Sequence, residues 1–147
     1  MPFSELNLPS FEFRIREEGQ RKQIFDSLRK RFVALTPEEW VRQHFIRFLT
    51  EAKRYPASLI NVERGVKIIS GTKRTDIVVH NRHGKPWMIV ECKAPDMPVT
   101  EDALLQAARY NMALQATFLV LTNGMEHYCC TLQNKQIEFL DDLPEFE

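Results

Sequence analysis

The sequence predicts a mixed α/β sheet flanked by two helices, and three observations lead to this fold class. Short apolar runs typical of strands alternate with two longer stretches of helical periodicity. Each helical stretch begins with a threonine that can cap it, followed by acidic residues. Prolines and glycine-containing turns separate the strand-like runs. The resulting order is a hairpin, a helix, three strands, a helix and two strands, which indicates an α/β or α+β protein.

Each element follows from a local pattern. An N-terminal β-hairpin is expected over about 11–33, because apolar and polar residues alternate there and Gly19 interrupts the run. Thr36 and Pro37 predict the start of the first helix, which should extend to about Lys53. The second helix is expected from Thr100 to about 115, and strands are expected at 59–63, 75–81, 87–93, 118–122 and 126–132.

Length and charge limit the classes of protein that fit this chain. Its 147 residues predict one domain over 1–147, with a core at about 35–132 and an acidic tail at 138–147. The 20 basic and 20 acidic residues cancel, which excludes a uniformly basic nucleic-acid coat. The tail holds five acids and no base, so the rest of the chain has a surplus of five bases. This polarity is compatible with a polyanionic partner, although a solvated tail is the more common interpretation.

The sequence favours a cytoplasmic protein without a membrane partner. The N-terminal residues lack the basic and apolar regions of a signal peptide. The longest apolar run, 116–121, is too short to cross a bilayer. The odd count of three cysteines, two of them adjacent, argues against disulfides and favours a reducing compartment.

The candidate site lies in segment 76–93, where two apolar strands surround a glycine-containing turn. If the turn is centred on residues 83–84, Asp76 lies directly opposite Glu91. Opposed Cβ atoms in an antiparallel pair are about 4.5–5.5 Å apart. The two-residue period of a strand puts Lys93 on the face of Glu91. Two carboxylates and one ammonium group are therefore expected to converge at one edge of the sheet.

Such a pair of carboxylates needs a compensating charge. At about 5 Å and an effective dielectric constant near 20, two carboxylates repel each other by roughly 3 kcal/mol. One lysine offsets part of this repulsion, and Mg²⁺ offsets more, because it prefers carboxylate oxygens. A lysine beside the metal can position or deprotonate a water molecule. An ion triad without metal is the other interpretation, and both stay open on these residues alone.

Gln106 and Tyr110 add a second candidate feature on the second helix. They are four residues apart, so they lie on one helix face. A buried amide and phenol need hydrogen-bond partners, which are either site groups or backbone groups.

These residues, taken in order, resemble the PD-(D/E)XK nuclease superfamily in its variant with a QxxxY motif. Asp76, Glu91-Cys-Lys93 and Gln106-Ala-Ala-Arg-Tyr110 match the D, ExK and QxxxY motifs. Stretches such as LTPEEWVRQHF and KRTDIVVHNRHGKPWMIVECKAPD are similar to the N-terminal nuclease domain of type I restriction enzyme R subunits. The resemblance covers 35–124 and implies a restriction-endonuclease-like αβββαβ core, with a mixed sheet flanked by two helices. Thr75 stands where the superfamily often has proline.

The resemblance also implies roles for individual residues. Metal ligands would be Asp76, Glu91, the backbone carbonyl of Cys92 and an acid of the first helix, Glu39. Glu38 and Glu63 remain alternatives for that last acid.

In the same way, Lys93 would orient the attacking water and stabilise the charge on the phosphate. Gln106 and Tyr110 would hold the lysine or a DNA phosphate. Lys73 and Arg74, just before the strand, are candidates for DNA binding.

The function implied is a Mg²⁺-dependent (or Mn²⁺-dependent) DNA endonuclease of a restriction-modification system. No GxxxxGK[ST] motif occurs, so the chain lacks the ATPase motor of intact R subunits. Its partners would be DNA and a helicase or methylase partner, or a second copy in a homodimer. Two alternatives stay open: a catalytically silent nuclease-fold module that binds nucleic acid or a restriction-complex partner, and an unrelated structural protein with an ion triad.

Overall fold

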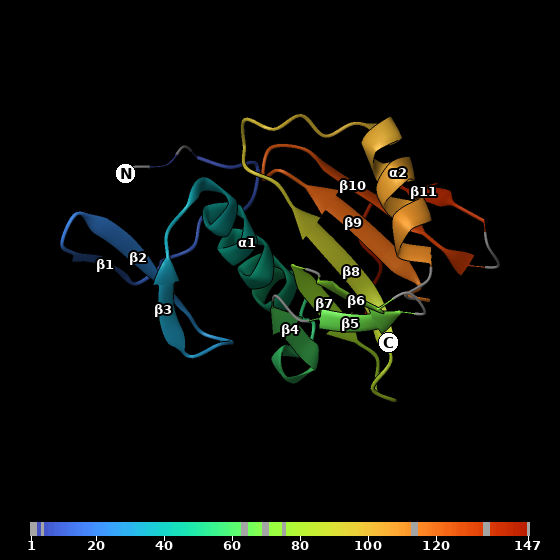
Figure 1. Cartoon of the computed structure of the whole chain (residues 1–147), viewed down its shortest axis with the longest axis horizontal. Helices are drawn as coiled ribbons and strands as arrows, with labels where there is room; N and C mark the ends of the chain where they lie inside the picture. The colour runs from blue at the N-terminus through green and yellow to red at the C-terminus, as the bar shows by residue number, and fades with distance from the viewer. Residues whose placement is uncertain are drawn as a thin grey trace.

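The computed structural model describes residues 3, 5–62, 65–68, 71–74, 76–112, 115–133 and 136–146. For 65–68, 71–74 and Tyr110, only the backbone is described. Within these residues, a six-stranded mixed sheet forms the centre of the molecule, in the order β11-β10-β9-β8-β7-β4 (Figure 1). Its strands are β4 (Ile60–Val62), β7 (Ile77–His80), β8 (Pro86–Cys92), β9 (Phe118–Thr122), β10 (His127–Thr131) and β11 (Glu138–Leu140).

The sheet is mixed because one central pair is parallel. β8 pairs in parallel with β9, whereas the other neighbouring strands of the sheet are antiparallel. A parallel pair needs a long crossover, and helix α2 (Glu101–Asn111) lies in that connection. The predicted fold class, a mixed α/β sheet with two helices and an N-terminal antiparallel hairpin, is confirmed.

The two helices cover opposite faces of the sheet (Figure 1). Helix α1 (Pro37–Arg47) packs its apolar side against Met88 and Val90 of β8. Helix α2 packs Leu104 against Ile89, the residue between them, on the other face. This alternation along β8 follows from the pleat of a strand, which turns successive side chains to opposite faces.

Both helices begin where the sequence predicts. The Oγ1 atom of Thr36 accepts a hydrogen bond from the backbone N–H of Glu39 at 3.0 Å. The Oγ1 atom of Thr100 accepts one from the backbone N–H of Ala103 at 3.1 Å. These bonds satisfy backbone donors that the first turn of a helix leaves without intrahelical partners. The first helix continues as a π-helical turn at Phe48–Ala52, close to its predicted end.

The N-terminal hairpin is a three-stranded antiparallel sheet rather than a two-stranded one. Its strands are β1 (Ile15–Glu18), β2 (Arg21–Asp26) and β3 (Arg31–Ala34). Strand β3 leads directly to the cap of α1. A further two-stranded hairpin of β5 (Gly65–Ile68) and β6 (Gly71–Arg74), which was not predicted from the sequence, separates β4 from β7. A 3₁₀ turn at Ala57–Leu59 precedes β4.

Candidate active site

The pairing of β7 with β8 has the predicted register next to the candidate site. Ile77 lies opposite Val90, and the next two pairs keep the same register before an irregularity after Val79. Asp76 directly precedes β7, and Glu91 directly follows Val90. The two carboxylates therefore belong to the same end of two adjacent central strands, as the sequence predicts.

Both carboxylate oxygens of Asp76 accept hydrogen bonds. Its Oδ1 accepts a hydrogen bond from the guanidinium of Arg42 at 2.6 Å, and its Oδ2 accepts one from the backbone N–H of Cys92 at 2.9 Å. The second bond ties the side chain to the end of β8. The first draws it toward the face of the sheet that α1 covers, and the side chain remains 23% exposed.

Glu91 contacts the helix on the other face of the sheet, α2. Its Oε1 accepts a hydrogen bond from the side-chain amide of Asn111 on α2 at 3.0 Å. Their convergence on one cation stays a prediction, because the side-chain partners of the two carboxylates lie on different helices, Arg42 on α1 and Asn111 on α2. Asp76 stands before the first residue of β7, where the strand pleat no longer fixes the direction of its side chain.

Arg42 connects Asp76 to the acids of α1. It is buried, and its guanidinium donates to Glu39 at 2.6 Å and to the half-exposed Glu38 at 3.2 Å, besides Asp76. Spacings of three and four residues place both glutamates beside Arg42 on the helix. Glu39, predicted as a metal ligand, thus meets Asp76 through Arg42.

The network continues into the turn between β2 and β3. Arg29 donates to buried Asp26 at 2.6 Å and to Glu39 at 3.1 Å. The amide of Gln43 donates to the same two carboxylates at 3.0 and 2.9 Å. A chain of charged hydrogen bonds therefore connects the N-terminal sheet to the edge that carries Asp76.

The electrostatics of the network follow from burial and pairing. Burial alone would raise the pKa of Asp26, but hydrogen bonds from Arg29 and Gln43 outweigh it and hold that pKa below its usual value. Burial would lower the pKa of Arg42, but the bond to Asp76 and the charge of Glu39 raise it instead. Both groups are therefore charged near neutral pH.

The other predicted site residues fall into two groups. Lys93 is exposed just after β8, Cys92 is buried with its side chain toward the core, and Gln106 is exposed on α2. Burial raises the pKa of the Cys92 thiol well above its usual value, so only its backbone is suited to a ligand role. The side chains of Tyr110, Lys73 and Arg74, and all of Glu63 and Thr75, lie outside the described residues.

The residues present suit a hard divalent cation by charge. Among the described residues, the carboxylates of Asp26, Glu38, Glu39 and Asp76 form ion pairs with Arg29 and Arg42, and these six side chains together carry a formal charge of −2. No three His, Cys, Asp or Glu side chains of the described residues form a ready-made metal cage. A cation at this edge would therefore be held by the carboxylates of Asp76 and Glu91 with backbone oxygen, and Arg42 is the group that competes for Asp76.

Two site features were missed from the sequence. Arg42 and Asn111 contact the two predicted carboxylates, yet neither belongs to the motifs that identified those carboxylates. The helical spacing of Glu38, Glu39 and Arg42 was a usable signal for the first of them. Nothing local indicates that Asn111, one residue beyond Tyr110, reaches Glu91.

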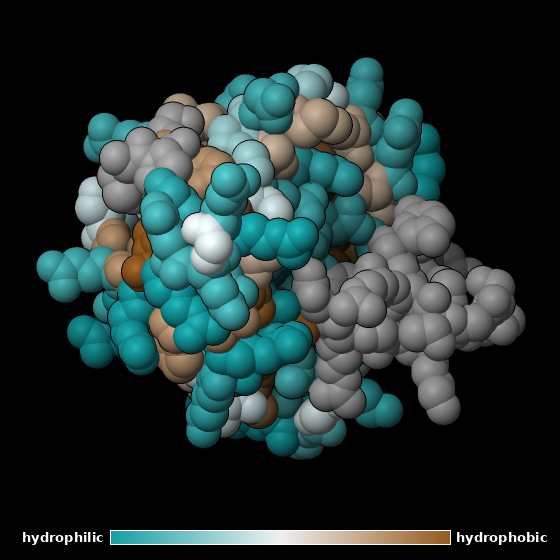
Figure 2. All heavy atoms as spheres, turned by 60° about the vertical axis from the view of Figure 1, so that its left-hand side comes forward, coloured by the Kyte–Doolittle hydropathy of each residue, from teal (hydrophilic) through white to brown (hydrophobic). Residues whose placement is uncertain are grey.

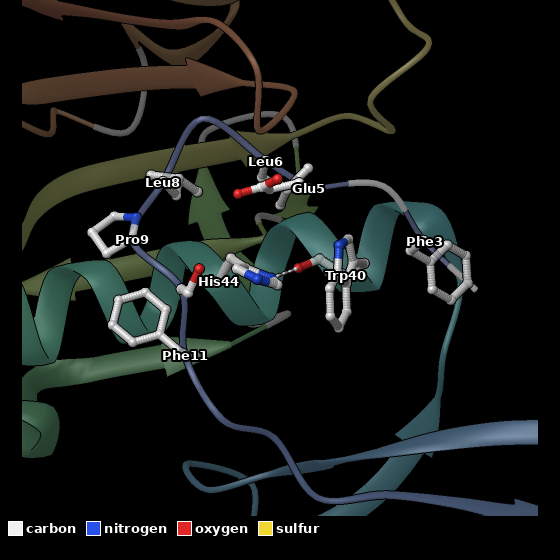
Figure 3. A pocket seen from close by; sticks show the side chains of 9 residues that line it. Phe3, Glu5, Leu6, Leu8, Pro9, Phe11, Trp40 and His44 are labelled. Atoms are coloured by element: carbon white, nitrogen blue, oxygen red, sulfur yellow. Dashed lines mark hydrogen bonds between the residues drawn. The ribbon is translucent and has the colours of Figure 1, made fainter. Parts of the chain in front are cut away.

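A separate hollow lies between the N-terminal segment and α1, away from Asp76 (Figure 3). It encloses about 360 Å³ and is lined largely by apolar and aromatic side chains, with Trp40 and His44 on its helical wall. Nδ1 of His44 lies 2.8 Å from the backbone carbonyl of Trp40. Burial lowers the pKa of His44.

Among the described residues, no helix has the length and apolar character needed to cross a membrane.

Comparison with known proteins places the chain in a family. No curated protein matches the sequence. The model of the family described as the type I restriction enzyme R protein N terminus matches residues 37–144, which include α1, the whole central sheet and the candidate site. On this match, the chain belongs to the family of type I restriction enzyme R protein N-termini.

Proposed function

We propose that the chain is a metal-dependent DNA endonuclease module that hydrolyses phosphodiester bonds within a restriction system. One observation carries the proposal: Asp76 and the Glu91-Cys-Lys93 segment stand at the same end of two adjacent central strands. Family membership supports the restriction context. DNA is the proposed substrate, and a helicase or methylase subunit, or a second copy of the chain, is the proposed partner.

The carboxylates of Asp76 and Glu91, with the backbone carbonyl of Cys92, would hold Mg²⁺ or Mn²⁺. Such a cation supplies positive charge to phosphate oxygens and lowers the pKa of a bound water. For Asp76 to serve as a ligand, Oδ1 must share its lone pairs with Arg42 or exchange that contact. The bond from Cys92 N–H to Oδ2 keeps the carboxylate at the strand end in either case.

Lys93 would act on the water and the phosphate. It directly follows β8, and its exposed ammonium group can reach a phosphate bound at the edge. The ammonium would orient the attacking water and stabilise charge that develops on the phosphate oxygens. Gln106 and Tyr110 are proposed to steady this lysine or the DNA phosphate, Lys73 and Arg74 to bind DNA, and Glu39 to act as an additional acid.

Cleavage of supercoiled and linear DNA with Mg²⁺ or Mn²⁺ tests the proposal. Lys93→Ala should lower the rate by about 10²–10⁴-fold, the usual contribution of a positioned acid–base group. Asp76→Asn and Glu91→Gln should do the same. Lys85→Ala removes an exposed lysine at the opposite end of β8 and should leave the rate unchanged. A Lys93→Ala variant that cleaves DNA at the wild-type rate would refute the mechanism.

A catalytically silent module is the second candidate, and one observation favours it. Arg42 already provides Asp76 with a cation, so the carboxylate has a partner without metal. Calorimetric titration with Mn²⁺ separates the candidates. A wild type that binds DNA but releases no heat with Mn²⁺ would support the silent module.

A further inference from the structure

The N-terminal sheet of β1, β2 and β3 has two unlike faces. Ile24 of β2 lies opposite Val33 of β3, and both pack toward the core around α1. The adjacent pair, Phe25 and Phe32, points to the other face, with ring centroids 5.2 Å apart. Figure 1 shows this three-stranded sheet on the side of α1 away from the central sheet.

Arginine side chains cover the aromatic pair. The guanidinium carbon of Arg16 lies 4.0 Å from the ring centroid of Phe32, and that of Arg14 lies 4.7 Å from that of Phe25. Both arginines are exposed, so their polar edges are available to solvent. Stacking on rings orders these long side chains before any ligand arrives. We call this surface the basic face. It includes the exposed bases Arg21 and Lys30 at its turns, and Arg31, which lies opposite Asp26 at the start of β3, on the side toward α1.

The basic face belongs to a segment of the chain with a surplus of positive charge. Residues 14–31 contain seven bases and three acids, although the whole chain is neutral. Two of these acids are exposed glutamates that pair with Arg16 and Lys22, and the third, Asp26, is buried in the network below. Among the described residues, no carboxylate pairs with Arg21, Lys30 or Arg31.

The acidic tail does not neutralise this surface, because it packs at the opposite end of α1. Asp142 lies 3.3 Å from the ammonium group of Lys53, after the π-helical turn. The ring of Phe146 packs against Trp87 at 5.1 Å. The basic face adjoins the N-terminal end of the same helix. Figure 2, in which the side of the N-terminal sheet comes forward, shows mostly hydrophilic side chains there.

A hollow of about 460 Å³ lies between β3 and the start of α1. Arg31 and Phe32 line it from β3, and Glu38, Glu39 and Arg42 line it from α1. Arg42 in turn contacts Asp76. A polyanion on the basic face is therefore next to the edge at which the proposed chemistry would occur.

We propose that the basic face binds the phosphate backbone of DNA and holds the strand that enters the site at Asp76. The proposal rests on the proposed function for its ligand, and it extends the contact surface well beyond Lys73 and Arg74. Binding would be insensitive to sequence, because the charges and rings on this face address backbone phosphates.

The test measures binding without cleavage. Fluorescence anisotropy of labelled 20-mers, single-stranded and duplex, is followed in EDTA with the full chain. The triple variant Arg21→Gln, Lys30→Gln, Arg31→Gln should weaken the Kd at least tenfold and reduce the slope of log K against log salt by about 2–3 for duplex DNA. Arg21→Lys with Arg31→Lys should stay within about threefold of wild type, because it keeps the charges.

A matched control removes three exposed bases elsewhere, with Arg54→Gln, Arg82→Gln and Lys85→Gln. The basic-face proposal predicts at most a twofold loss for this control. Equal losses in both triple variants, or no loss in the first, would overturn it, and so would a wild type that binds neither strand form. Urea denaturation checks that both variants are folded. Because binding is measured without metal, failure of cleavage refutes only the proposed function and leaves this result unchanged.

Discussion

Replacement of Arg42 by methionine tests whether the charge network holds the edge of the central sheet to α1. Methionine keeps the apolar stem that packs inside the helix–sheet interface and removes only the guanidinium group. The change leaves Asp76 without its closest cation and leaves Glu39 with Arg29 and Gln43 as partners.

The magnitude follows from burial of the partners. Removal of one member of a buried ion pair costs about 3–5 kcal/mol. Glu38 is 47% exposed, so its pair with Arg42 contributes at most about 1 kcal/mol. Asp76 keeps the Cys92 N–H bond and reaches solvent, which softens the loss. We therefore expect the lower end, about 3 kcal/mol, which is a large fraction of the usual stability of a small protein.

Urea denaturation, followed by tryptophan fluorescence, measures this loss. The midpoint should fall by about 1–2 M at a typical m-value. Arg109→Met is the matched control, because this arginine is exposed on α2, and its change should stay within about 0.5 kcal/mol. A double-mutant cycle with Asp76→Asn should give a coupling energy of about 0.5–3 kcal/mol. Zero coupling, or an unchanged midpoint for Arg42→Met, would refute the reasoning.

Three further predictions address other parts of the fold. Gly124 has φ +86, and a Cβ added there would contact the side chains of Leu6 and Val41. Gly124→Ala should therefore lower the free energy of unfolding by about 1–2 kcal/mol in denaturation experiments. The loss should exceed that of Gly84→Ala, where an added Cβ has no neighbour within 4 Å. Burial lowers the pKa of His44, so the unfolded state binds more protons than the folded state. The free energy of unfolding should therefore decrease as the pH falls below 6.5. An equal slope of this free energy against pH in His44→Gln would contradict this. Removal of the second helix cap by T100A should cost about 1 kcal/mol, and no change in the thermal midpoint would disprove the capping role.

The elements and the register near the site could be predicted because local patterns determine them. Threonine caps located both helix starts, and the glycine-containing turn fixed the pairing of β7 with β8 as far as Val79. Strand β9 was predicted with its observed bounds because Ala116 to Thr122 is a compact apolar run followed by a turn. The short strands β3, β5, β6 and β11 were missed, since each begins with glycine or a charged residue and has too short an apolar pattern to detect.

The side-chain contacts of the site could not be predicted in the same way. Arg42 and Asp76 are 34 positions apart in the chain, and their contact depends on how α1 lies across the sheet. The same holds for Asn111 and Glu91, which are 20 positions apart. Strand parity predicts the face of a residue only inside a strand, and Asp76 stands outside it. The metal, the catalytic roles and the DNA contacts remain predictions.

The single parallel pair has a consequence for folding kinetics. Strands β4, β7 and β8 are antiparallel neighbours close in sequence, and so are β9, β10 and β11. Only the seam between β8 and β9 requires closure of the long loop through α2, which makes it the slow, non-local event. Truncations in that seam, such as Ile89→Val or Leu119→Ala, should slow refolding if the seam forms in the transition state. Changes on the outer strand β11 should chiefly accelerate unfolding.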